Sequence, residues 1–184
     1  MSTYGTVLAV DYGLGKTPIA DQLVELASGN ADIYVEPRDE CVRVTAHLGV
    51  VEVQPALIEV FTAVAPCRAA IAEDLDEFGA SWVVLHCRED RTEVIHRRYL
   101  LNADPDDDEA VSLAIAALGS DPRTLDVAGP DAARAAAVLF GTDPSRMEQA
   151  ETASAAAWQE IGIVGGPFRW WDALDLTWPG ESAD

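Results

Sequence analysis

The amino-acid sequence predicts an α+β fold, in which an antiparallel, β-rich amino-terminal half with two or three helices precedes a helical carboxy-terminal half. Up to about residue 102, short apolar runs and alternating apolar and polar residues recur, as is typical of strands with one wet face. Beyond that point the chain is rich in alanine, with apolar residues at helical spacing. Its 184 residues fit a single domain made of a β-rich part (1–102), a helical layer (103–160) and a Trp-rich tail (161–184).

The first predicted elements are a buried strand, a helix and a group of strands. Residues 6–11 form an apolar run that ends at two glycines, which indicates a strand followed by a tight turn. Pro18, behind Thr17 as a possible N-cap, predicts an amphipathic helix over residues 18–28. Three further strands are expected, most simply as an antiparallel meander, at residues 32–36, 41–45 and 50–53.

The middle of the chain predicts a helical segment and then a hairpin. Pro55 opens an apolar-rich helix that runs to about Val64, and Pro66 either breaks this helix or starts a second one ending near residues 78–79. Residues 81–87 and 92–101 are rich in β-branched and apolar residues and flank a charged turn. We expect these two segments to pair as a hairpin.

The helical half begins with an acidic run. Asp106, Asp107 and Asp108 lie where a helix would start, and carboxylates in a first turn face the positive end of the helix dipole. Further helices are expected over residues 111–118, 131–140 and 144–159, separated by short turns that contain glycine or proline.

The tail combines aromatic and basic residues in a short stretch. Its large side chains are Phe168, Arg169, Trp170, Trp171 and Trp178. Because so much aromatic area is unfavourable in water, we expect the segment to pack back on the parent domain. The alternative is that part of it is an exposed anchor for a partner, since Trp and Arg are enriched at interface hot spots.

The composition excludes several classes of protein. With 32 acidic and 12 basic residues the formal net charge is -20, which argues against binding to a nucleic-acid backbone. No run is long and apolar enough for a membrane span, and the amino terminus lacks a secretory pattern, so we expect a cytoplasmic protein that binds no membrane. Cys41, Cys67 and Cys87 lack metal-binding spacing and are expected to be free buried thiols.

One fragment resembles a phosphate-binding loop. Residues 15–17 spell the end of the GxxxxGK[ST] motif, whose amides and lysine hold phosphates. The first glycine of that motif would fall at Val10, and Pro18 removes an amide at the helix start. A nucleotide or small-molecule site built from Asp11, Lys16 and Thr17 therefore remains an alternative reading.

Other candidate chemistry is weaker. Cys87 and Arg91 are too close in sequence, with no intervening glycine, for a cysteine phosphatase loop. His86 and His96 could approach across the predicted hairpin, but two surface histidines are the ordinary outcome, and no metal-ligand spacing is present. We therefore expect no catalytic residue, no metal and no cofactor.

The acidity, the small size and the missing catalytic motif favour a stoichiometric inhibitor of a basic protein, of the immunity-protein or antitoxin type. Its interface would be formed by the large tail residues named above together with Asp106, Asp107 and Asp108. The chain would be a monomer or a homodimer. Three alternatives remain: an enzyme that binds a small molecule or nucleotide at the Gly13–Thr17 turn, a nucleic-acid mimic, and a protein whose charge serves only solubility.

Overall fold

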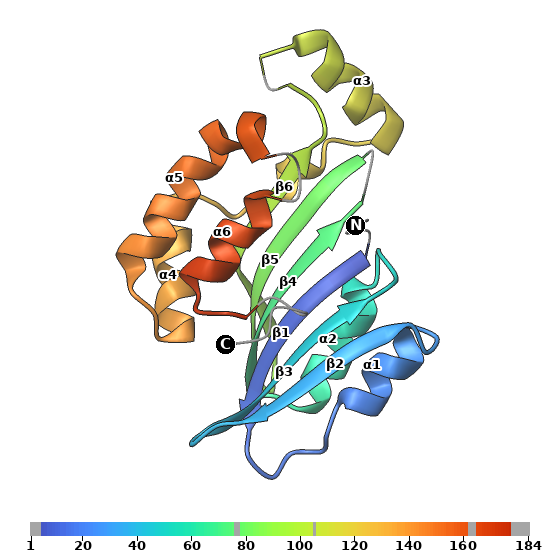
Figure 1. The fold of residues 1–184 in the computed structure, drawn as a ribbon, viewed down its shortest axis with the longest axis vertical. Helices are drawn as coiled ribbons and strands as arrows, with labels where there is room; N and C mark the ends of the chain where they lie inside the picture. Colours follow the sequence, from blue (N-terminus) through green and yellow to red (C-terminus); the bar gives the residue numbers. More distant parts are fainter. Residues whose placement is uncertain (1–4, 76–77, 105, 162–164, 178–184) are drawn as a thin grey trace.

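One antiparallel sheet organises the fold, as the sequence predicts (Figure 1). The computed structural model describes residues 5–75, 78–104, 106–161 and 165–177, leaving aside the side chains of residues 153–167. Its six strands lie in the order β2-β3-β1-β4-β5-β6. They are β1 (Gly5–Gly13), β2 (Ala31–Pro37), β3 (Cys41–Leu48), β4 (Cys67–Asp74), β5 (Gly79–Cys87) and β6 (Thr92–Leu101).

Helices cover both faces of this sheet. Figure 1 shows α1 and α2 on one face and α4, α5 and α6 on the other. The helices are α1 (Ala20–Leu26), α2 (Gln54–Ala63), α3 (Asp108–Leu118), α4 (Pro130–Phe140), α5 (Pro144–Ile161) and α6 (Gly165–Ala173), with a short 3-10 helix, η2 (Pro122–Leu125), between α3 and α4. We call the two sides the α1/α2 face and the α4–α6 face.

The first six elements have the split β-α-β connection. The chain runs β1-α1-β2-β3-α2-β4, while the strands lie in the order β2-β3-β1-β4, so that β1 and β3 each occupy the gap left by a crossover. The β5–β6 hairpin then extends the sheet beyond β4. This arrangement occurs with many unrelated functions, so function has to be argued from a site.

The two faces have separate cores, because successive strand residues point to opposite sides of the sheet. On the α1/α2 face Leu8 and Val10 pack with Leu57 and Phe61 of α2. On the α4–α6 face the core includes Ala133 and Ala137 of α4 and three tryptophans, Trp82, Trp170 and Trp171. The predicted return of the aromatic tail onto the domain is therefore confirmed.

The largest error of the sequence prediction concerns β4, since no strand was expected here: Pro66 was expected either to break the preceding helix or to start a second one. Its sequence, CRAAIAED, consists largely of residues that favour helices in isolation. In the structure it pairs with β1 on one side and β5 on the other, and Ala69, Ala70 and Ala72 are buried. A central strand covered on both faces tolerates small side chains, so tertiary contacts override local preference.

Two other boundaries also differ from expectation. Residues 50–53 form no strand, and Val53 is instead the N-cap of α2. The predicted meander is therefore wrong, because β3 pairs with β2 and β1. Helix α1 begins at Ala20 rather than at Pro18, and Ile19 precedes it without a side-chain capping bond.

Several local predictions are confirmed. The hairpin forms with β5 and β6 at nearly the expected bounds, and the predicted breaks before Pro130 and Pro144 are the starts of α4 and α5. Asp107 is the N-cap of α3, and its side chain accepts hydrogen bonds from the backbone N–H groups of Glu109 and Ala110. The acidic run therefore caps a helix, as expected.

Candidate functional site

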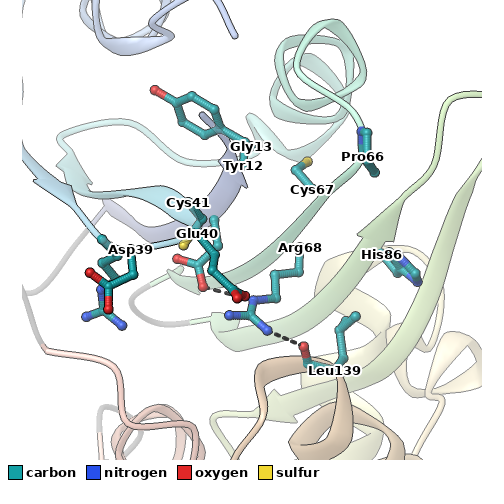
Figure 2. Close-up of a pocket in the computed structure, with 12 residues that line it drawn as sticks. Tyr12, Gly13, Asp39, Glu40, Cys41, Pro66, Cys67, Arg68, His86 and Leu139 are labelled. Atoms are coloured by element: carbon teal, nitrogen blue, oxygen red, sulfur yellow. Dashed lines mark hydrogen bonds and ion pairs between the residues drawn. The ribbon is translucent and has the colours of Figure 1, made fainter. Parts of the chain in front are cut away.

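A hollow of about 610 Å³ opens at the end of the sheet where β1 finishes and β4 begins (Figure 2). Its walls come from the β2–β3 turn, the end of β1, the start of β4, the end of β5 and α4. Small-ligand pockets are typically about 300–1,000 Å³. We call it the Arg68 hollow, and the lining residues used below are Asp39, Glu40, Cys67, Arg68 and His86.

Asp11 in β1 lies between two arginines from the neighbouring strands. Arg43 donates from Nε and Nη2 to the two carboxylate oxygens at 2.6 and 2.7 Å, and Arg68 donates from Nε to Oδ2 at 2.9 Å. Burial by itself raises the pKa of Asp11, but the hydrogen bonds and charges of Arg43 and Arg68 outweigh it and lower that pKa. Asp11 is therefore an anion at neutral pH, and its charge is matched within the protein.

Arg68 is held firmly and still reaches the hollow. Its Nη1 donates to the carbonyl oxygen of Leu139 at 2.5 Å, and its guanidinium lies 5.1 Å from the centre of the Phe140 ring. Its side chain is 30% exposed, against 5% for Arg43. Because Arg43 already neutralises Asp11 from inside the core, Arg68 brings a net positive charge to the hollow.

The wall formed by the β2–β3 turn is acidic. Asp39 and Glu40 are both exposed, and Figure 2 shows Asp39 and His86 at opposite sides of the view with Arg68 between them. Arg38 in the same turn donates from Nε and Nη2 to Glu36 Oε2 at 3.2 and 2.9 Å. Since Glu36 offsets the charge of Arg38, the turn as a whole contributes negative charge.

His86 adds a neutral polar group to the basic wall. It lies beside Arg68 in the β4–β5 register and opposite Glu93 in the β5–β6 register. Burial, and next the positive charge of Arg88, lower the pKa of His86 below its usual value. The imidazole is therefore neutral at pH 7, and the positive charge on this wall comes from Arg68.

A second polar cluster lies within the protein, between the sheet and α5. Trp82 Nε1 donates to His96 Nδ1 at 2.9 Å, so the imidazole proton resides on Nε2, which donates to Glu151 Oε2 at 3.0 Å. Glu151 Oε1 accepts from Gly129 N at 2.8 Å and forms an ion pair with Arg98 at 3.1 Å. His96 is 0% exposed, so no substrate reaches it and the cluster fastens α5 to the sheet. The expectation that His96 is a surface residue is wrong.

The residues of the predicted nucleotide site do not converge. Lys16 Nζ donates to the carbonyl oxygen of Ala65 at 2.8 Å, which braces the loop before β4. Asp11 is held by the arginines described above, and Thr17 is exposed. Of the Gly13–Thr17 turn, only Gly13 lines the Arg68 hollow.

The tail tryptophans lie inside the molecule. Trp170 is 0% and Trp171 1% exposed, and their rings lie 5.7 and 6.1 Å from that of Trp82. Phe168 and Arg169 are partly exposed, while Trp178 lies outside the described residues. The predicted interface residues Asp106, Asp107 and Asp108 lie at the start of α3, where Asp107 serves as the helix cap.

The sequence reasoning missed Arg43, Arg68 and His86 as members of a site. A signal for Arg43 was present in the sequence. It lies in a strand whose residues alternate between the two faces of the sheet, and an arginine on a buried face requires a carboxylate partner. Arg68 gave no such signal, since the segment around it was not predicted to be a strand. The hollow itself depends on which strands are neighbours, which local patterns do not report.

No protein-family model and no curated protein matches this chain. One solved structure that matches is LarC2, the C-terminal domain of a cyclometallase involved in the synthesis of the NPN cofactor of lactate racemase, in its apo form. The sequences are 15% identical, and the match covers 74% of this chain and 97% of that domain with a TM-score of 0.25. At this level of likeness the match carries no argument about the activity, metal or substrate of the present chain.

The predicted function as a stoichiometric inhibitor is wrong. Trp170 and Trp171 were to form the centre of its interface, but both are core residues of the α4–α6 face. A basic partner protein and a monomeric or homodimeric state stay predictions of the sequence.

Proposed function

We propose that the protein binds a small zwitterionic molecule, such as an amino acid or another amine-bearing organic acid, in the Arg68 hollow. The observation that supports this most directly is the separation of charge across the hollow. Arg68 provides a fixed cation on the β4 side, while Asp39 and Glu40 provide carboxylates in the β2–β3 turn. An anionic group of the ligand would bind Arg68, and its ammonium group would lie toward the turn.

Arg68 is suited to the anionic end of such a ligand. Its Nε and Nη1 are used by Asp11 and Leu139, which fixes the guanidinium plane and leaves Nη2 for a ligand. A guanidinium held in one orientation loses little conformational freedom when it binds a carboxylate. His86 lies next to it as a neutral hydrogen-bonding group.

The acidic turn distinguishes a zwitterion from a nucleotide. Two carboxylates at the rim would repel the phosphates of a nucleotide, and the net charge of -20 would oppose its approach. A zwitterion has no net charge and meets attraction at both ends. The proposal therefore keeps the small-molecule alternative of the sequence prediction and moves its site from Lys16 and Thr17 to Arg68.

Isothermal titration calorimetry with the full chain tests this proposal. The panel contains α- and ω-amino acids, dicarboxylates of similar length, diamines and nucleotides. We expect binding by at least one amino acid and weaker or absent binding by matched compounds that carry only one sign of charge. Preferential binding of dicarboxylates, of diamines or of nucleotides would contradict the proposal, as would the absence of binding throughout the panel.

Two variants place the ligand in the hollow. Arg68→Met is expected to weaken binding about tenfold or more, because hydrogen bonds to charged groups contribute about 1.5–3 kcal/mol. Asp39→Asn/Glu40→Gln removes the acidic charges from an exposed turn without touching the core, and it should weaken zwitterion binding while sparing dicarboxylates. Arg134→Met, which removes an arginine from the surface of α4, is the matched control and should leave affinity unchanged. Equal affinity in all three variants would exclude this hollow.

We propose that this binding takes place in the cytoplasm. Cys41, Cys67 and Cys87 are free, which suits a reducing compartment. Within the described part of the chain, no helix has both the length and the apolar character needed to cross a membrane. Fractionation of cells that produce the tagged full-length protein checks the location.

A further inference from the structure

Two cysteines that are far apart in sequence lie side by side on the α1/α2 face of the sheet, the face opposite Arg68. Cys67 opens β4 and Cys87 ends β5, and the antiparallel register places them directly opposite each other. Residues paired in this way point to the same face of the sheet. Both side chains are buried, at 5% and 0% exposure, and both are free thiols.

The spacing of such a pair is compatible with a disulfide. Directly opposed residues in antiparallel strands have Cα atoms about 4.5–5.5 Å apart, and disulfides span Cα separations of about 4.4–6.8 Å. The strands therefore need no rearrangement to allow a bond between the two sulfurs. The sequence predicts only scattered free thiols. The structure places two of them opposite each other, where a bond could cross-link neighbouring strands.

Of the two residues, Cys67 lies nearer to the opening of the hollow. Cys67 lines the Arg68 hollow, whereas Cys87 is not among its walls. The Cys67 thiol also donates to the carbonyl oxygen of Phe61 at 3.5 Å, near the end of α2. Cys67 is thus the member of the pair closer to solvent, at 5% exposure against 0%, and Cys87 behind it is the resolving thiol.

The pair is chemically activated because the two thiols share a proton. A hydrogen bond from Cys67 lowers the pKa of Cys87 to about 7, against the opposing effect of burial, and Thr92 assists. The pKa of Cys67 is correspondingly raised, first by its hydrogen bond with Cys87 and then by burial. One proton therefore leaves the pair near neutral pH, and attack by Cys67 requires that the remaining proton pass along the hydrogen bond from Cys67 to Cys87.

We propose that Cys67 and Cys87 are a redox-active dithiol, which a small hydroperoxide converts into a cross-strand disulfide. In the first step the Cys67 proton passes to Cys87, the Cys67 thiolate attacks hydrogen peroxide, and the O–O bond breaks. This gives Cys67 sulfenic acid and hydroxide, and the hydroxide becomes the first water by taking up from solvent the proton that the pair had released. In the second step the Cys87 sulfur attacks Cys67, the S–O bond breaks, and hydroxide leaves and takes up the remaining thiol proton as a second water. Two thiols are oxidised by two electrons in total and one peroxide is reduced to two waters.

The bond changes the contacts of Cys67. It removes the S–H donor that Cys67 offers to Phe61 and links the start of β4 covalently to the end of β5. A thiol reductant restores the pair by thiol–disulfide exchange. The dithiol is independent of the proposed zwitterion, so failure of one leaves the other standing.

The test is a mass measurement on the folded full chain. The protein is treated with hydrogen peroxide at pH 7, then unfolded in an alkylating reagent, and its intact mass and tryptic peptides are determined. We expect a loss of about 2 Da, protection of two thiols from alkylation, a linked peptide containing Cys67 and Cys87, and full reversal by dithiothreitol. Oxidation should accelerate as the pH rises through about 7.

Variants separate this result from nonspecific oxidation. Cys41→Ser should form the linkage as readily as the parent chain, because Cys41 is not part of the pair. Cys67→Ser and Cys87→Ser should lose the linkage and gain oxygen on the remaining thiol, and circular dichroism verifies that they are folded. Peroxide adducts in the parent chain without a Cys67–Cys87 peptide, or linkage that forms only after unfolding, would overturn the proposal.

Discussion

The two faces of the sheet bury carboxyl groups in opposite ways. On the α1/α2 face Glu73 is 6% exposed and accepts hydrogen bonds from the hydroxyl groups of Thr6 and Ser81 and from the N–H of Val53. Burial raises the pKa of Glu73 despite these bonds. On the α4–α6 face Asp11 is 4% exposed, yet its pKa is lowered. Similar burial therefore gives opposite shifts, and the two arginines beside Asp11 account for the difference.

The comparison also shows how each face keeps its helices. The α1/α2 face is mainly aliphatic, and apolar burial is not directional. The α4–α6 face adds directional contacts that start from the sheet: Arg68 donates to the Leu139 carbonyl after most of α4, and Arg43 donates to the Asp175 carbonyl just beyond α6 at 3.2 Å. These bonds join the later helices to particular strands, which connects helix placement to the arginine that lines the hollow.

The largest expected effect comes from the aromatic core of the α4–α6 face. Trp170→Ala should destabilise the protein by about 4 kcal/mol, because removal of a buried tryptophan leaves a large cavity. Urea unfolding followed by circular dichroism measures this change. Val138→Ala, on the exposed side of α4, is the control and should change stability little. A small effect of Trp170→Ala would mean that this face is held mainly by its polar contacts.

The next prediction compares the loss of stability when one partner of the Asp11–Arg43 ion pair is removed with the loss when both partners are replaced by apolar residues. Asp11→Leu should cost about 3 kcal/mol, since it leaves the buried guanidinium of Arg43 without its anion. Asp11→Leu/Arg43→Met should recover much of this loss, because both charges are then absent. The same unfolding assay gives the two values. A double variant that is less stable than the single one would show that the pair itself stabilises this face.

Acid should loosen the two faces unequally. The pKa of Glu151 is lowered, because the bonds from His96 and Gly129 and the charge of Arg98 outweigh burial, and the pKa of Asp11 is lowered as well. Their stabilisation is complete above the unfolded pKa values of about 4 and fades as pH falls through the lower folded values. Amide hydrogen exchange between pH 6 and pH 3 should therefore show α4 losing protection before α2. Equal loss in both helices would contradict this assignment.

The smallest effect is expected on the other face. A raised pKa means that folded Glu73 holds its proton more tightly than the unfolded chain does, so its contribution favours folding at low pH and is lost as pH rises through the folded value. Glu73→Gln should therefore be neutral or slightly stabilising at pH 7, by about 1 kcal/mol or less. Thermal unfolding at pH 7 and pH 4 measures it, and the gain should vanish at the lower pH. Marked destabilisation at pH 7 would show that the carboxylate itself is required.

Local sequence determined those elements that are stabilised by contacts between residues close together in the chain. The β5–β6 hairpin, the starts of α4 and α5 at prolines, and the capping of α3 by Asp107 each depend on residues within a few positions. The burial of the tail could also be foreseen, since its aromatic area is unfavourable in water. These features together supplied the α+β class.

The site was decided by tertiary structure. Ala-rich β4 becomes a strand only because β1 and β5 form backbone hydrogen bonds with it on both sides. That placement brings Arg68 next to Asp11 and Cys67 next to Cys87. Every one of these contacts joins residues from separate strands. The energy of a strand pairing and of a buried ion pair resides in contacts between distant parts of the chain, so no short window of sequence contains it.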